Sequence, residues 1–253
     1  MLIRILTAIT AGAPLMRTTT ALFICAGVLT SAPDRTYNVQ EILEQTRAVY
    51  AALDSYSDTG VVVHEYGTSS QDQHTFITSF KRNPRGFLLD FHKQGGDRYV
   101  IWGEPEAFHT WWKTTGQQYD YKNPNNATAI SGSGQNTSSA ALKIPTLLYG
   151  KSSLAAALLT MAEPAVSGTG TLDGRRCYRV TGRASDRYSA SGAEVNVHRI
   201  TLWIDAESLL IRQVVEEWTP LPGQRSRLIT TYQPQANPTL AADAVRFIPP
   251  AGK

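Results

Sequence analysis

Two kinds of hydrophobic spacing divide the chain. Between residues 38 and 54, apolar side chains recur every three or four positions, beginning with Val39, Ile42 and Leu43. This spacing predicts one amphipathic helix, and Asn38 followed by Glu41 matches a capping box at its start. From residue 58 onward, apolar and polar positions alternate instead, which is typical of strands with one buried face.

The alternating segments are short and are separated by turn sequences such as Asn83-Pro84-Arg85-Gly86 and Asp173-Gly174. This succession predicts an antiparallel meander, interrupted by a loop over 123–140 and a buried helix over 152–161 that ends at Pro164. We therefore expect an α+β, mainly β fold. Its curled antiparallel sheet would form a half-barrel of about eleven strands, with helices covering the concave face.

Apolar strand positions on the expected concave face are candidates for lining a ligand cavity. Strongly curved sheets tend to leave an interior that their side chains do not fill, although these residues would equally suit a solid core. The candidate lining residues are Val61, Val63, Phe76, Phe80, Phe87, Leu89, Phe91, Tyr99, Ile101, Trp112, Leu154, Leu158, Ile200, Leu202, Ile204 and Val214.

Residues 1–32 have the pattern of a secretory signal peptide. Arg17 precedes an apolar run from Ala21 to Leu29, and small residues follow it. The run is shorter than the ~20 residues of a membrane-spanning helix. Met16 is an alternative start of the protein. Ile24 precedes Cys25 where lipid attachment needs a small residue, so the pattern argues against a lipid anchor at Cys25. We expect an exported, periplasmic protein with one domain over 33–253.

Composition and charge narrow the function further. The chain is 42% hydrophobic and 18% charged, as in ordinary globular proteins, which excludes wholesale disorder. Its formal net charge is +3, two of its basic residues lie in 1–32, and no Lys/Arg cluster suggests a nucleic-acid partner. Gly150-Lys151-Ser152 fails as a phosphate loop because Pro145 stands where that motif needs glycine.

Other catalytic patterns are missing from the sequence as well. The five histidines are scattered over the expected strands without the spacing of metal ligands, and we expect Cys177 to be a buried small hydrophobic residue. No pair of carboxylates can be singled out for acid–base catalysis. The sequence therefore predicts neither a metal nor a cofactor, and it favours a protein that is not an enzyme.

Four short motifs occur in a defined order. They are Asp54-Ser55-Tyr56-Ser57 after the first helix, the hairpin 80–87, the hairpin 202–212 and the terminal Phe247-Ile248-Pro249-Pro250. This order resembles the LolA-like and LolB-like superfamily of periplasmic lipoprotein carriers, closest to its outer-membrane lipoprotein-sorting branch. The resemblance covers most of 38–252. It implies an eleven-stranded half-barrel, closed by helices, that holds acyl chains in an apolar cavity.

The resemblance implies a carrier or chaperone in outer-membrane biogenesis that binds and transports lipid, lipoprotein acyl chains or another hydrophobic ligand. Its expected partners are a lipid or lipid-anchored protein and a membrane-bound donor or acceptor. One alternative is an envelope regulator or sensor that binds a protein partner with the same fold. Another is a hydrolase whose site the sequence does not reveal.

Overall fold

One antiparallel sheet accounts for all the strands in the computed structural model, which describes residues 38–67, 70–122, 139–149, 158–186, 195–221 and 224–250. The chain divides into two units, Met1–Thr36 and Tyr37–Lys253, and every described residue lies in the second. The expected signal peptide, Cys25, Leu154, Gly150-Lys151-Ser152 and most of the loop over 123–140 therefore lie outside the described residues.

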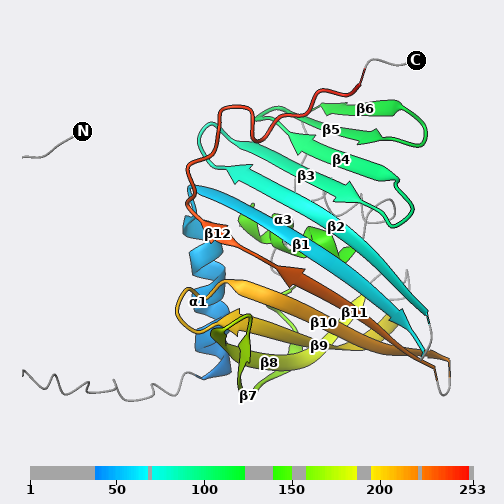
Figure 1. Ribbon diagram of the computed structural model, residues 1–253. Coiled ribbons are helices and arrows are strands. Elements are labelled where there is room, and N and C mark those ends of the chain that lie inside the picture. Colours follow the sequence, from blue (N-terminus) through cyan, green and yellow to red (C-terminus); the bar gives the residue numbers. More distant parts are fainter. Residues whose placement is uncertain are drawn as a thin grey trace, which may run out of the picture. The chain divides into compact units, whose positions relative to one another are not determined.

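The twelve strands follow the order β6-β5-β4-β3-β2-β1-β11-β10-β9-β8-β7, and β12 pairs with β1 beside this path. The sheet curls but does not close, since β6 and β7 form its two edges (Figure 1). The strands are β1 (Ser55–Tyr66), β2 (Ser70–Lys81), β3 (Gly86–His92), β4 (Arg98–Gly103), β5 (Ala107–Trp112), β6 (Gln117–Lys122), β7 (Ala162–Leu172), β8 (Arg175–Asp186), β9 (Val195–Asp205), β10 (Ile211–Leu221), β11 (Gln224–Tyr232) and β12 (Gln235–Ala236).

The expected first helix is confirmed as α1 (Val39–Ala52), which begins where the capping box predicts. The Asn38 side chain accepts a hydrogen bond of 2.8 Å from the backbone N–H of Glu41. Buried side chains of α1, including Ile42, Thr46 and Tyr50, recur at helical spacing. Ile42 and Tyr50 belong to the apolar cluster that includes residues of the sheet.

A second helical segment lies against the same face. The 3₁₀-helix η2 (Ser139–Leu142) leads directly into α3 (Lys143–Leu148), and α3 contacts α1. Nearly every described side chain of this segment is buried, and its leucines belong to the apolar cluster of the sheet's inner face. The sequence predicted a helix later, over 152–161; Leu158 and Leu159 of that range form a buried turn.

Pro164 does not end a helix as predicted. It lies within β7, which is an edge strand with irregular register between Ala162 and Ala165. An edge position tolerates proline because the missing N–H removes no bond from an interior ladder. The predicted Asp173-Gly174 turn does join β7 to β8, and both residues have positive φ, 49° and 74°, as tight hairpin turns require.

The sheet has two distinct faces. On the inner face, which α1, η2 and α3 cover, one large cluster of buried apolar residues extends from β5 to β8. On the outer face, Trp102 and Trp111 form a smaller cluster with Val100, and Phe247 of the C-terminal segment packs on it with ring centroids 5.3 Å from each indole. The mainly β fold class with an open, curled sheet and helices on one face is confirmed.

Candidate functional site

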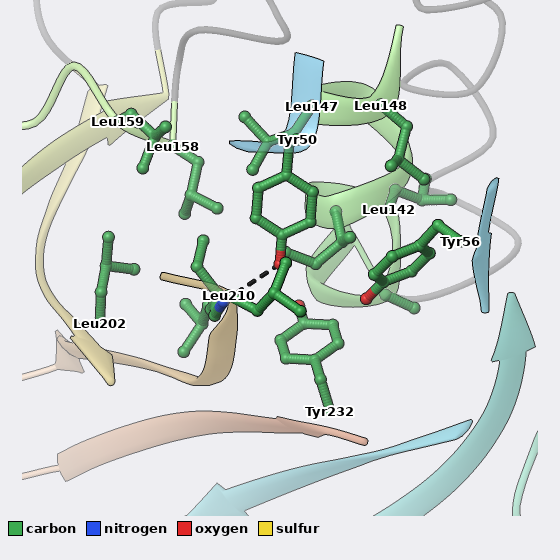
Figure 2. Packing of buried hydrophobic residues seen from close by; sticks show 14 of the residues in the cluster. Tyr50, Tyr56, Leu142, Leu147, Leu148, Leu158, Leu159, Leu202, Leu210 and Tyr232 are labelled. Carbon is green, nitrogen blue, oxygen red and sulfur yellow. Dashed lines mark hydrogen bonds between the residues drawn. The ribbon is translucent and has the colours of Figure 1, made fainter. Parts of the chain in front are cut away.

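Most of the predicted lining residues do come together. Twelve are buried in the single cluster of the inner face, which also includes buried leucines of η2 and α3 (Figure 2). Trp112 is half-buried and packs against that cluster. The twelve are Phe76, Phe80, Phe87, Leu89, Phe91, Tyr99, Ile101, Leu158, Ile200, Leu202, Ile204 and Val214.

Val61 and Val63 correct the prediction. They point to the outer face and are half-buried, whereas Val62 between them is fully buried on the inner face. The sequence Val61-Val62-Val63 is apolar in both parities, so alternation alone could not fix which side faces inward. Gly60 fixes it, because any Cβ there would meet the Phe76 ring at about 2.1 Å. Even-numbered residues of β1 therefore face the interior.

Aromatic side chains dominate one half of the inner face and aliphatic side chains the other. Phe76, Phe80, Phe87 and Phe91 lie on β2 and β3, where Phe80 faces Phe87 and Phe76 faces Phe91 across the strand pair. On β8 to β10 most of the corresponding positions are aliphatic, such as Leu202, which pairs with Val180 and Val214. The interior is thus apolar from one half of the sheet to the other.

Two buried carboxyl groups interrupt this apolar interior, and the sequence analysis singled out neither. The first is Asp58 on β1, which is only 3% exposed. Its Oδ2 accepts a hydrogen bond of 2.7 Å from the hydroxyl of Tyr56. Burial raises the pKa of Asp58 from 3.8 to about 6, although the hydroxyls of Tyr56 and Thr78 act against that rise.

Three tyrosines surround this carboxyl group. Tyr50 of α1, Tyr56 of β1 and Tyr232 of β11 are all buried, and their hydroxyl ends point toward one another (Figure 2). The Tyr50 and Tyr56 ring centroids are 5.9 Å apart. The Tyr50 hydroxyl accepts a hydrogen bond of 3.1 Å from the backbone N–H of Ile211, where the β9–β10 register shifts. Burial raises the pKa of each tyrosine, so all three hydroxyls stay protonated.

The second buried carboxyl group is Glu216 on β10, which is 6% exposed. Its Oε1 lies 2.9 Å from Nζ of Lys143 on α3 and 3.0 Å from Nε2 of His198 on β9. These two partners outweigh the cost of burial and lower the pKa of Glu216 from 4.5 to about 2. The ion pair ties α3 to the half of the sheet that carries aliphatic side chains.

Sequence reasoning missed these groups for an identifiable reason. Asp58 shares the parity of Tyr56, Gly60 and Val62, so the correct phase of β1 would have placed it inside. Lys143 and Glu216 lie far apart in sequence, and no local pattern pairs a lysine on one element with a glutamate on another. Only the three-dimensional arrangement reveals that contact.

Two hollows open at the surface of the described structure, and neither lies between the sheet and its helices. One, of about 370 Å³, lies over β1 and β2 and is lined by Val61, Ile77 and Thr231 among others. The other, of about 610 Å³, is polar and lies at the turns that contain Asp173 and Glu207. Apolar side chains of the cluster, by contrast, occupy the space between the inner face and the helices.

The described residues show neither a metal-binding cluster nor a membrane-spanning helix. In the described ranges, no three His, Cys, Asp or Glu side chains are gathered as a metal site would need. Among the same residues, no helix has the length and apolar character to cross a membrane. Cys177 is a free, buried cysteine, as the sequence predicted, and burial raises the pKa of its thiol.

Comparison with known proteins gives similarity of fold only. No family model matches the chain, and no curated protein does either. Among solved structures, the Mycobacterium tuberculosis lipoprotein LppX matches with 11% identity over 81% of this chain and 98% of that chain, at a TM-score of 0.46. LprF from Mycobacterium bovis matches with 12% identity over 82% and 97%, at a TM-score of 0.45.

A LolA superfamily protein from Nitrosomonas europaea matches with 10% identity over 83% of this chain and 98% of that chain, at a TM-score of 0.36. At these identities and TM-scores, the likeness carries no conclusion on ligand, partner or activity.

Proposed function

We propose that this protein is a periplasmic carrier that binds a lipid, the acyl chains of a lipoprotein or another hydrophobic ligand between the inner face of its sheet and the helices. One observation carries the proposal: the inner face is apolar over both halves of an open sheet, and only short helical segments cover it in the described structure. Each methylene group of an acyl chain that replaced water contact with this surface would contribute about 0.8 kcal/mol.

Access to this surface depends on the helical cover. The segment η2–α3 has ten residues and is joined to the sheet by the Lys143–Glu216 ion pair. A ligand that displaced the leucines of η2 and α3 would exchange one set of apolar contacts for another, so the net cost of opening would be small. Loading and release would then follow from movement of the cover or from transfer to a membrane-bound acceptor, without a chemical step.

Mass spectrometry tests the proposal directly. We expect the protein purified from its own envelope to carry a stoichiometric acyl-bearing mass under native conditions and to lose it on organic extraction. A clean apo mass would instead favour an envelope regulator that binds a protein partner, which crosslinking in the envelope would identify.

Matched substitutions test whether the ligand binds at the inner face. Leu202→Arg puts a charge in the interior and is expected to abolish uptake, while Ile77→Arg on the outer face, where Ile77 is 45% exposed, should leave it unchanged. Near-UV circular dichroism establishes that each variant is folded. If Leu202→Arg does not fold, Leu158→Gln at the margin of the cluster replaces it. Equal uptake by the folded inner-face and outer-face variants would contradict the proposal.

A further inference from the structure

The two edges of the sheet, β6 and β7, differ in how well they are protected against further strand pairing (Figure 1). β7 contains Pro164 and two irregularities of register. Such features disrupt the row of N–H and C=O groups that another strand would need. β6 has neither feature: it contains no proline or glycine, and all six of its residues pair with β5 in unbroken register. β6 is therefore the edge at which the sheet can be extended.

The backbone of β6 presents hydrogen-bonding groups on its open side. The C=O of Ala107 on β5 accepts a hydrogen bond of 2.9 Å from the N–H of Glu104, so the odd-numbered residues of β5 bond toward β4. Its even-numbered residues therefore bond to the odd-numbered residues of β6, with which they pair. The N–H and C=O groups of Gln118, Asp120 and Lys122 point to the open edge, where no described strand pairs with them.

The side chains of β6 carry one charge of each sign on the outer face and two aromatic rings on the inner face. Asp120 accepts a hydrogen bond of 2.7 Å from Gln118 at Oδ1 and remains exposed. Lys122 is exposed as well, and no acidic side chain among the described residues forms an ion pair with it. Tyr119 and Tyr121 are 52% and 48% exposed. Both the charges and the rings are thus accessible to a partner strand.

A second copy of the chain offers an edge that complements this one. Two antiparallel copies of β6 related by a two-fold axis keep their inner faces on the same side, so residues of like face pair. A pair centred on Asp120 would place two carboxylates opposite each other, and one centred on Tyr119 would leave Lys122 opposite no acid. A pair centred on Tyr121 places Asp120 of each copy opposite Lys122 of the other, and the two Tyr121 rings lie side by side.

We infer that β6 is an interface at which two copies of this chain pair in antiparallel orientation about Tyr121. Each facing pair of Asp120 and Lys122 exchanges its backbone hydrogen bonds across the junction and brings opposite charges together on the outer face. On the inner face, the Tyr121 ring lies 6.0 Å from that of Phe108, and this aromatic row continues into the second copy. The two sheets become one, whatever the inner face binds.

Sedimentation velocity of the purified full-length protein tests the inference. An edge this short buries less surface than the ~1,200 Å² of a stable protein–protein interface, so we expect a reversible dimer with a Kd on the order of 10–100 µM. The sedimentation coefficient should rise from that of a monomer toward that of a dimer between about 5 and about 500 µM. A coefficient that stays at the monomer value over this whole range would overturn the inference.

Charge reversal on β6 identifies the surface and the register. Asp120→Lys places a lysine opposite Lys122 of the second copy, and Lys122→Asp places an aspartate opposite Asp120. Each variant alone should therefore dimerise at least about tenfold more weakly than the wild type. An equimolar mixture of the two variants restores both opposite-charge pairs and should dimerise at least as well as the wild type. A mixture that dimerises no better than the separate variants contradicts this pairing.

Matched charge reversals on α1 control for the change in net charge. Glu44→Lys and Arg47→Glu alter two exposed residues of that helix by the same amounts. Each should dimerise as the wild type does, and mixing them should add nothing. Near-UV circular dichroism establishes that all four variants are folded. If the α1 variants weaken the dimer and the β6 variants do not, the interface lies elsewhere and the inference is overturned.

Discussion

Asp58 on β1 and Glu216 on β10 are buried to nearly the same extent on one face of one sheet, but their neighbours differ. Glu216 contacts a lysine and a histidine, which hold its pKa near 2. Asp58 contacts tyrosine and threonine hydroxyls, and burial raises its pKa to about 6. Burial alone therefore does not determine the state of an interior acid, because the charge of its neighbours decides the sign of the shift.

The difference also separates two roles. The Glu216 region joins an element of the cover to the sheet, since Lys143 belongs to α3 and the other two partners to β9 and β10. The Asp58 region has no opposite charge, and its carboxyl group lies among the hydroxyls of Tyr56 and Thr78. One buried acid thus joins the cover to the sheet through an ion pair, whereas the other is held by hydroxyl groups of the sheet itself.

Removing the cation at Glu216 should have the largest effect. Lys143→Met leaves a buried carboxylate with His198 as its remaining contact, and we expect the free energy of unfolding to fall by about 3–5 kcal/mol at pH 7. Urea denaturation measures the change. Lys122→Met, on the exposed edge strand β6, is the matched control and should shift stability by less than about 0.5 kcal/mol. A loss no greater than that of the control would mean that the Lys143 contact is not formed in solution.

Stability measured at acidic pH tests the lowered pKa of Glu216. Its pKa is lower in the folded state, so the stability that it contributes is present above pH 4.5 and is lost as pH falls toward 2. The shift of 4.5 to about 2 corresponds to about 3 kcal/mol. In Glu216→Gln this loss should be absent, and the difference in urea midpoint between variant and wild type should narrow on acidification. A constant difference from pH 5 to pH 2 would show that Glu216 does not titrate as described.

Asp58→Asn should change how stability depends on pH between about pH 4 and pH 8, above the acid range in which Glu216 acts. The Asp58 carboxyl binds its proton more tightly in the folded state, so stability decreases as pH rises from 3.8 through 6. The shift corresponds to about 2–3 kcal/mol, which Asp58→Asn should abolish. Thermal melting between pH 4 and pH 8 follows the effect: relative to wild type, the variant gains stability with rising pH. Parallel profiles would contradict the raised pKa.

Tyr56→Phe should give the smallest effect. It removes one hydrogen bond to the Asp58 carboxylate while keeping the ring, and we expect a loss of about 1–2 kcal/mol at pH 7. Because the hydroxyl lowers the pKa of Asp58, the variant should also extend the pH-dependent loss of stability to higher pH. The same substitution at exposed Tyr121 is the control. An unchanged pH profile in folded Tyr56→Phe would exclude this bond as a cause of the shift.

The sequence predicted the architecture better than the polar interior. Periodicity located α1 and the meander, and most of the candidate lining residues are buried together because they lie in strands with clear alternation, such as Phe87, Leu89 and Phe91. Periodicity failed at Val61 and Val63, because odd- and even-numbered residues are both apolar there. Contact of Gly60 with Phe76 on the neighbouring strand β2 decides which of them face inward. Periodicity also failed at Pro164, which an edge strand accommodates. The family resemblance agreed with the fold but assigned no residue to Asp58 or Glu216.

The pairing of β1 with β11 has a consequence for synthesis. Gly60 pairs with Tyr232, so the edge of β1 opposite β2 acquires its long neighbour only when β11, the last long strand, is complete. Until then a growing chain presents the free N–H and C=O groups of β1 along an unpaired edge, where another copy could add a strand. A chain truncated before Gln224 would keep that edge permanently. From this strand order we expect such fragments to aggregate more readily than the full chain.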